Sequence, residues 1–69
     1  MQVPRLKEWR LKKVLTQEEL GRRAGVGEVT VNRIEGGQKA RISTIRKLAD
    51  ALGIRPEQLI EPENAQHYT

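Results

Sequence analysis

The fold is decided by residues 15–34, which read LTQEELGRRAGVGEVTVNRI. The stretch opens with TQEE at positions 16–19, which fits the capping box S/T-x-x-E. In this box the Thr16 hydroxyl accepts a hydrogen bond from the Glu19 amide, and the Glu19 carboxylate accepts one from the Thr16 amide. The signature predicts a helix over residues 17–24.

A three-residue turn at positions 25–27, GVG, joins this helix to a second one predicted over residues 28–35. The first glycine of the turn suits the left-handed conformation in which many helices end. Gly21 is small enough for two helices to cross closely, and Val31 and Ile34 supply inward anchors for the second helix. Two helices joined by so short a turn form a helix-turn-helix. The outer face of the second helix is then free to enter a major groove about 12 Å wide.

Helical patterns continue on both sides of this unit. A first helix is predicted over residues 4–13. Downstream, we expect Ser43 to cap a helix that Gly53 ends, and Pro56 to take the first position of a short helix that ends near Ile60. The chain is therefore predicted to be all-α, a compact five-helix bundle. Its expected core comprises Leu6, Trp9, Leu15, Leu20, Ala24, Val26, Val31, Ile34, Ile45, Leu48, Ala49, Leu52, Ile54 and Leu59.

The charge balance favours a polyanionic partner. The chain has 13 Lys and Arg residues against 9 Asp and Glu, a net charge of +4. Two of the acids and none of the bases fall in the last nine residues, so residues 1–60 carry a net charge of +6. A compact basic body suits nucleic acid, and a basic solubilising surface is the alternative explanation. We expect residues 1–60 to form the domain and residues 61–69 a polar, flexible tail.

The residue inventory argues against catalysis and metal binding. The chain has no Cys, and its one His, His67, lies close to the end. A phosphate-binding loop of the type G-x-x-x-x-G-K-[ST] is absent. No apolar run reaches the roughly 20 residues of a membrane span, and no signal-peptide pattern follows Met1. We therefore expect a non-enzymatic cytoplasmic protein without a metal or cofactor.

Three stretches of the chain resemble the Cro/repressor-type helix-turn-helix family, often called the XRE family. They are LTQEELGRRAGV at 15–26, VNRIEGG at 31–37 and TIRKLADALGI at 44–54. The resemblance extends over about residues 3–60. It implies a lambda-repressor-like bundle whose third helix recognises DNA, in a protein of the prokaryotic cytosol or nucleoid.

The resemblance also implies which residues act. DNA contacts are expected from the start of the second helix, the outer face of the third and the loop after it. An ion pair is implied between Arg10 and Glu35. The implied DNA-binding residues are Thr16, Gln17, Glu28, Val29, Thr30, Asn32, Arg33, Lys39 and Arg41.

Most of these residues have a second interpretation. The Gln17 amide can bind a phosphate or a neighbouring side chain. Arg33 can pair with guanine and Asn32 with adenine, or both can lie on a solvated helix face. Lys39 and Arg41 suit phosphate contacts, and they also suit an ordinary solvated loop.

The sequence departs from the family pattern at several positions. Glu28 and Val29 replace the small polar or basic residues that are common there. Glu28 can accept from cytosine N4, or it can only stabilise the start of its helix, and Val29 can touch a thymine methyl. A proline frequent in the loop near Lys39 is missing, and Val14 stands where the family often has glycine.

The leading hypothesis is a sequence-specific regulator of transcription, a repressor, that binds double-stranded DNA. Two-fold dimers are the usual way to read paired half-sites, so we expect a weak homodimer or one formed on DNA. Its surface is expected around Ile54, Leu59, Ile60 and Tyr68. The alternatives are a protein-interaction module, such as an antitoxin or adaptor, and a fragment of a larger regulator. No small-molecule effector is indicated.

Overall fold

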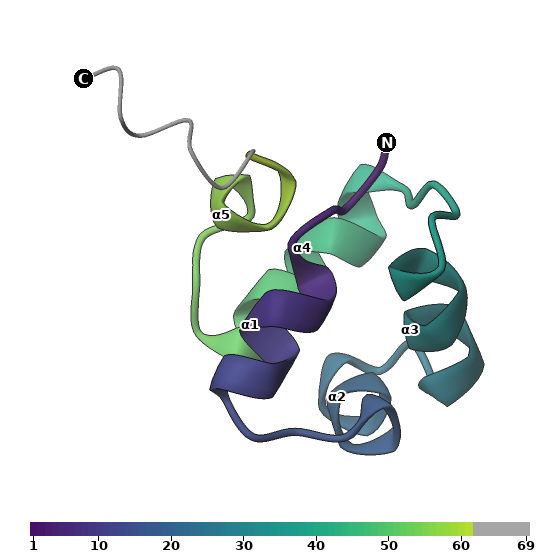
Figure 1. Cartoon of the computed structure of the whole chain (residues 1–69), viewed down its shortest axis with the longest axis vertical. Helices are drawn as coiled ribbons and strands as arrows, with labels where there is room; N and C mark the ends of the chain where they lie inside the picture. The colour runs from purple at the N-terminus through teal and green to yellow at the C-terminus, as the bar shows by residue number, and fades with distance from the viewer. Residues whose placement is uncertain (62–69) are drawn as a thin grey trace.

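The computed structural model describes residues 1–61, which form five α-helices and no strand (Figure 1). This arrangement confirms the predicted all-α fold. The helices are α1 (Leu6–Lys12), α2 (Gln17–Ala24), α3 (Glu28–Glu35), α4 (Ile42–Leu52) and α5 (Glu57–Ile60). Within the described part of the chain, no helix is long and apolar enough to cross a membrane.

Both ends of α2 form as the sequence predicts. The Glu19 amide donates to the Thr16 hydroxyl at 3.0 Å, and the Thr16 amide donates to the Glu19 carboxylate at 2.9 Å. Gly25 follows the helix with φ of 72°, in the left-handed region. These signals are local, and the predicted bounds of α2 and α3 agree with the structure to the residue.

The turn between α2 and α3 depends on Gly21. The amides of Val26 and Gly27 both donate to the Gly21 carbonyl, at 3.0 and 3.1 Å. A Cβ atom added at Gly21 would lie 2.4 Å from the carbonyl carbon of Gly27 and 2.7 Å from the Glu28 nitrogen. Because both of those atoms belong to the backbone, any side chain here would separate α3 from α2.

Three predicted helix starts were wrong. α1 begins at Leu6, not Pro4, because Arg5 has a non-helical backbone (φ −104°, ψ 12°). α4 begins at Ile42, and its N-cap is the extended Arg41, so Ser43 lies inside the helix and caps nothing. Pro56 is the N-cap of α5 and not its first residue.

The core follows the prediction with few exceptions. Trp9, Val26 and Ile54 are only partly buried and pack against its edge. Val3 and Ala40 are buried, and the sequence did not predict this. Leu59 is fully buried, so its assignment to a dimer surface was wrong, and Tyr68 lies outside the described residues. The buried apolar residues are Val3, Leu6, Leu15, Leu20, Ala24, Val31, Ile34, Ala40, Ile45, Leu48, Ala49, Leu52 and Leu59.

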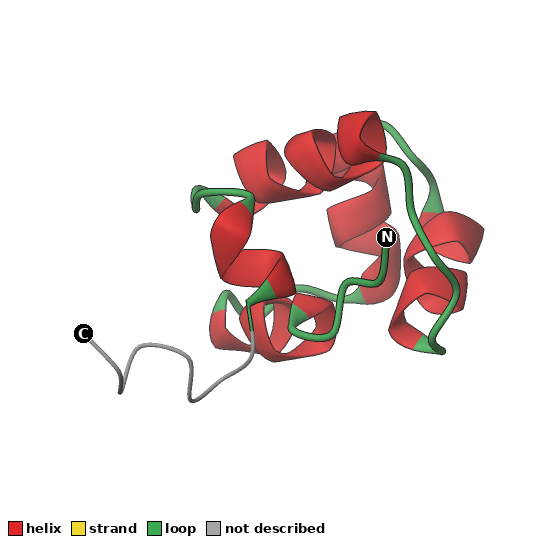
Figure 2. Ribbon diagram, turned by 90° about the horizontal axis from the view of Figure 1, so that it is seen from above, coloured by secondary structure: helices red, strands yellow, loops and turns green. Residues whose placement is uncertain are grey.

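Long-range hydrogen bonds hold both the first residues of the chain and α5 against the rest of the domain. The Ala40 amide donates to the Met1 carbonyl at 2.7 Å, which holds the first residues against the loop between α3 and α4 (Figure 2). The Trp9 indole donates to the Gln58 carbonyl at 3.1 Å, which holds α5 against α1. The contact between the first residues and this loop explains why Val3 and Ala40 are buried.

Val14, in the loop after α1, is the one non-glycine residue of the described chain with positive φ, at 56°. Its side chain is 86% exposed, so no packing compensates for the conformation. The left-handed region is unfavourable for a β-branched residue because its Cβ crowds the backbone. The chain thus adopts the conformation that suits glycine without having a glycine there.

We predict that Val14→Gly stabilises the domain. Relief of the left-handed strain is worth about 1–2 kcal/mol, and the extra entropy of glycine in the unfolded chain offsets about 0.5–1 kcal/mol of it. Thermal denaturation should show a Tm higher by about 3–6 °C. Lys13→Gly is the control, because Lys13 has φ of −89° and glycine there should lower the Tm. A Tm for Val14→Gly at or below that of the wild type would contradict the proposed strain.

Candidate nucleic-acid interface

The outer face of α3 carries five of the residues that the sequence singled out. Glu28, Val29, Asn32 and Arg33 are exposed, and Thr30 is partly buried. Beneath them Val31 is 0% exposed and Ile34 is 4% exposed. The helix is therefore fixed from below by these two buried anchors. The five residues on its outer face, here called the polar stripe, lie toward solvent.

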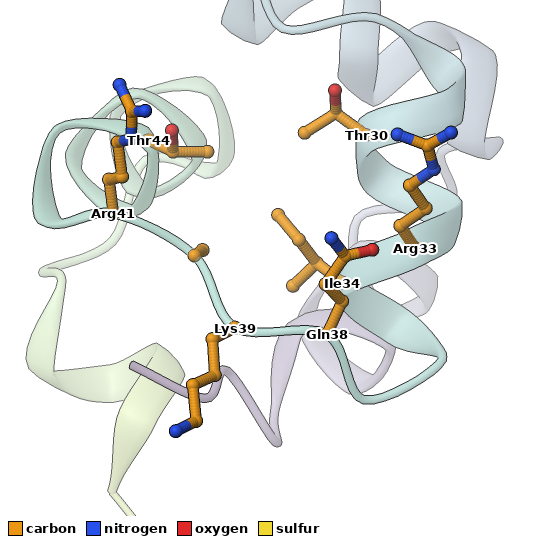
Figure 3. A pocket seen from close by; sticks show the side chains of 8 residues that line it. Thr30, Arg33, Ile34, Gln38, Lys39, Arg41 and Thr44 are labelled. Carbon is orange, nitrogen blue, oxygen red and sulfur yellow. The ribbon is translucent and has the colours of Figure 1, made fainter.

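A cleft of about 250 Å³ lies between α3, the following loop and the start of α4 (Figure 3). Arg33 and Arg41 lie on opposite sides of the cleft, and the side chains of Thr30 and Thr44 also line it. Lys39 also lines the cleft, but its side chain extends away from the others (Figure 3). None of the lining residues is acidic: they are Thr30, Arg33, Ile34, Gln38, Lys39, Ala40, Arg41 and Thr44. Such a cleft suits a phosphate group.

Sequence reasoning missed two polar residues of this cleft, Gln38 and Thr44. Thr44 is the third residue of α4, and its local sequence does not distinguish it from any other first-turn residue. The signal that would have located it is the extended Arg41, which is a feature of the tertiary loop path and not of the local sequence.

The start of α2 lies on the other side of α3. Thr16 is exposed, and its hydroxyl oxygen accepts the capping bond from Glu19. Gln17 is partly buried, and its amide bridges two residues of α3: its nitrogen donates to Glu35 at 3.0 Å, and its oxygen accepts from Asn32 at 3.3 Å. The structure thus joins Gln17 to α3, whereas Lys39 and Arg41 reach the site through the loop.

Arg10 and Glu35 form a two-bond ion pair beneath this surface. The Arg10 Nε and Nη2 atoms lie 2.6 and 3.0 Å from the two carboxylate oxygens of Glu35. The remaining Arg10 nitrogen, Nη1, donates to the Leu15 carbonyl at 2.8 Å. The two side chains are only 9% and 5% exposed. One guanidinium therefore ties α1 to the end of α3 and to the loop before α2.

The electrostatics of this pair keep it charged. Burial alone would raise the pKa of the Glu35 carboxyl, but the hydrogen bonds from Arg10 and Gln17 and the charge of Arg10 hold that pKa below its usual value. The hydrogen bond to Glu35 in turn raises the pKa of the Arg10 guanidinium. A negative charge therefore persists at the base of the polar stripe.

Comparison with known proteins agrees with this geometry. A helix-turn-helix family model matches residues 6–59. The chain belongs to the Cro/repressor-type, or XRE, helix-turn-helix family. This family consists of non-enzymatic DNA-binding proteins, so the chain is a DNA-binding regulator of transcription.

Two solved structures of this helix-turn-helix type resemble the domain. The restriction-modification controller protein C.AhdI from Aeromonas hydrophila is 39% identical, with a TM-score of 0.76, over 80% of this chain and 85% of that one. A hypothetical transcription factor, NHTF, from Neisseria is 31% identical, with a TM-score of 0.83, over 91% of this chain and 74% of that one. No curated protein matches the chain.

We predict that Glu35→Ala lowers thermal stability far more than Glu18→Ala. Loss of Glu35 leaves the Arg10 guanidinium buried and unpaired, which costs about 3 kcal/mol. Glu18 pairs only with Arg22, at 3.6 Å on the surface, where both side chains are more than half exposed. Removal of that pair should cost less than about 1 kcal/mol.

Thermal melting curves of the wild type, Glu35→Ala and Glu18→Ala are recorded at neutral pH and again at acid pH. Because the pKa of Glu35 is lowered in the folded state, its contribution is present above its ordinary value of 4.5 and is lost as the pH falls. The gap in Tm between wild type and Glu35→Ala should therefore narrow in acid. A larger loss for Glu18→Ala than for Glu35→Ala would contradict a stabilising role for the buried pair.

Proposed function

We propose that this chain is a sequence-specific repressor that places α3 in the major groove of duplex DNA. The observation that carries the proposal is the exposed stripe of α3, held rigid by Val31 and Ile34 and bordered by the basic cleft. A helix presented in this way fits the width of the groove. Bound over a promoter, a domain of this size would block access to the DNA that it covers.

The stripe offers groups for direct reading of bases. In this proposal the Arg33 guanidinium pairs with guanine O6 and N7 or with a phosphate, and Asn32 pairs with adenine. Val29, 61% exposed, suits a thymine methyl. Glu28 accepts from cytosine N4 or acts only on the helix start, where Gly27 provides no side-chain cap.

Phosphate contacts on both sides of α3 would fix its register on the duplex. On one side, Thr16 and Gln17 stand at the start of α2, where free amides and the helix dipole favour an anion. On the other side, the cleft offers Arg41 and the hydroxyl groups of Thr30 and Thr44. Such contacts position the domain without reading sequence.

The similar proteins support a regulatory role. C.AhdI is described as a controller protein of a restriction-modification system and NHTF as a transcription factor. At 39% and 31% identity, these likenesses make control of transcription the function most consistent with the fold. The matched range, residues 6–59, lies within the proposed DNA-binding domain at 1–60.

We further propose that two copies bind a two-fold operator through an apolar groove between α4 and α5. Ile42, 59% exposed, and Met1, 55% exposed, stand beside it. Arg46 and Glu57 also line this groove, and a two-fold arrangement can bring the cation of each copy to the acid of the other. The groove is lined by Met1, Ile42, Ile45, Arg46, Pro56, Glu57 and Ile60.

We predict that Arg33→Ala weakens binding to the cognate site far more than binding to random DNA. One lost base contact should cost about 1–3 kcal/mol on the cognate site, or roughly 5- to 150-fold in affinity. The cognate sequence is first obtained by selection from a random duplex library, and affinities are measured by fluorescence anisotropy at fixed salt.

Arg55→Ala is the matched control for this variant. Arg55 lies in the loop between α4 and α5 and lines a pocket together with Trp9. This loop lies on the other side of α1 from α3 (Figure 1). Arg55→Ala removes the same charge as Arg33→Ala, so it should lower the affinities for the cognate site and for random DNA slightly and equally. Equal losses on cognate and random DNA for Arg33→Ala would instead assign Arg33 to phosphate positioning.

Salt dependence separates the proposal from a protein-interaction module. Binding that neutralises several phosphates releases counterions, so its affinity falls steeply with salt. An antitoxin or adaptor that acts only on proteins would show no such binding to duplex DNA.

We predict that Ile42→Ser weakens cooperative binding to a two-half-site operator while binding to one half-site changes little. Serine removes exposed apolar surface without adding charge near the DNA. Leu11→Ser on α1 is the matched control, because Leu11 is 56% exposed and lies away from the groove. Sedimentation and DNA titrations over a range of protein concentrations provide the measurement. Unchanged cooperativity in Ile42→Ser would place the dimer surface elsewhere.

A further inference from the structure

We propose that Glu35 is a positioning residue for base recognition, acting through Gln17 on Asn32. The three side chains form a continuous chain of hydrogen bonds from the buried ion pair to the exposed stripe of α3. This inference rests on the proposed function, because it concerns how the stripe reads a base. It assigns to the buried carboxylate a role in specificity in addition to its role in stability.

The geometry supplies each link of the chain. The Gln17 amide nitrogen lies 3.0 Å from Glu35 Oε1, the same oxygen that accepts from Arg10 Nη2. The Gln17 amide oxygen lies 3.3 Å from the Asn32 amide nitrogen. The side chain of Glu35 is only 5% exposed, whereas Asn32 is exposed. The side chain of Gln17 is thus the only link among the described residues between the carboxylate and the Asn32 amide.

The charge at the base of the chain sets the direction of every bond. A carboxylate can only accept hydrogen bonds, so the amide nitrogen of Gln17 must face Glu35 and its oxygen must face outward. That oxygen also only accepts, so Asn32 must turn its nitrogen toward Gln17. Since Arg10 keeps Glu35 ionised, neither amide is free to flip.

The result is a preset pair of groups on the surface. Asn32 donates one amide hydrogen to Gln17. Among residues 1–61, its other amide hydrogen and its Oδ1 have no hydrogen-bond partner. One donor beside one acceptor is the pattern that pairs with adenine N7 and N6 in the major groove. The orientation that this pattern needs is in place before DNA arrives, which lowers the entropic cost of recognition.

The variants Glu35→Gln and Gln17→Met break the chain in different ways. A glutamine at 35 keeps the shape but presents an NH₂ group as well as an oxygen. That NH₂ group must replace one of the two oxygens that accept from Arg10, so the fixed set of acceptors that orients the Gln17 amide is lost. Methionine at 17 keeps the length of the side chain and removes both hydrogen bonds. Glu18→Gln, the same charge change on the exposed face of α2, is the matched control.

The first measurement uses the folded protein without DNA. Side-chain amide resonances of Asn32, and of Gln17 in the variants that keep it, are recorded by NMR at one neutral pH. Glu35→Gln should shift the Asn32 amide although the two side chains share no hydrogen bond. In a Gln17→Met background, Glu35→Gln should no longer shift it. Glu18→Gln should leave both amides unchanged. A purely structural Glu35 would leave the exposed Asn32 amide unmoved in a folded variant, and that result would overturn the proposal.

The second measurement uses single base-pair substitutions in the selected cognate site. Asn32→Ala identifies the base pair that Asn32 reads. Gln17→Met and Glu35→Gln should reduce the preference at that base pair by about fivefold or more, relative to the other positions. In the Asn32→Ala background, Gln17→Met should cause no further loss there. If Glu35→Gln does not fold, Gln17→Met tests the same chain of hydrogen bonds at its middle link, because Gln17 is only partly buried.

The outcomes separate this inference from the proposed function. If the wild-type chain has no sequence preference on duplex DNA, the proposed function fails and the inference fails with it. If the wild type is specific but Gln17→Met keeps the full preference at the Asn32 base pair, only the inference is overturned. The same holds if Asn32→Ala leaves every base preference unchanged.

Discussion

The structure depends on one close approach between two helices. At Gly21 the backbone of α2 meets the backbone of residues 27 and 28, with no room for a Cβ atom. Because the Gly21 carbonyl also accepts the amides of Val26 and Gly27, the turn and the crossing are fixed by the same residue. This contact sets the angle at which α3 leaves α2, and with it the direction in which the polar stripe faces.

The Arg10–Glu35 pair holds that arrangement from the other side. A chain of 69 residues without cysteine has neither disulfides nor a large core to supply rigidity. Three guanidinium hydrogen bonds tie α1, the loop at Leu15 and the end of α3 together at one point. Burying both charges costs desolvation free energy, but removing either partner afterwards leaves an unpaired buried charge and destabilises the fold. It thus favours one relative placement of three elements over others that would bury a similar apolar area.

The two sides of α3 differ in how they are prepared for a ligand. Toward α2, the side chains of Gln17, Asn32 and Glu35 are already bonded to one another. Toward α4, the cleft with Arg33, Arg41 and the two threonine hydroxyl groups is open (Figure 3). An open basic cleft can adapt to a phosphate, whereas a bonded network presents a fixed pattern. The two sides of one short helix therefore differ in preorganisation: the side toward α2 is bonded and the side toward α4 is open.

The sequence by itself determined what is fixed by contacts within a few residues. The capping box at Thr16, the left-handed Gly25 and the anchors Val31 and Ile34 act over about one helical turn, so α2 and α3 were predicted to the residue. Only the tertiary structure decided the rest: the start of α4 at Ile42, the cleft at Thr44, the burial of Val3 and Ala40 and the bridge from Glu35 to Asn32. Each of these depends on residues far apart in the chain, such as Met1 against Ala40, and loop paths between distant partners leave no periodic or local signal to read.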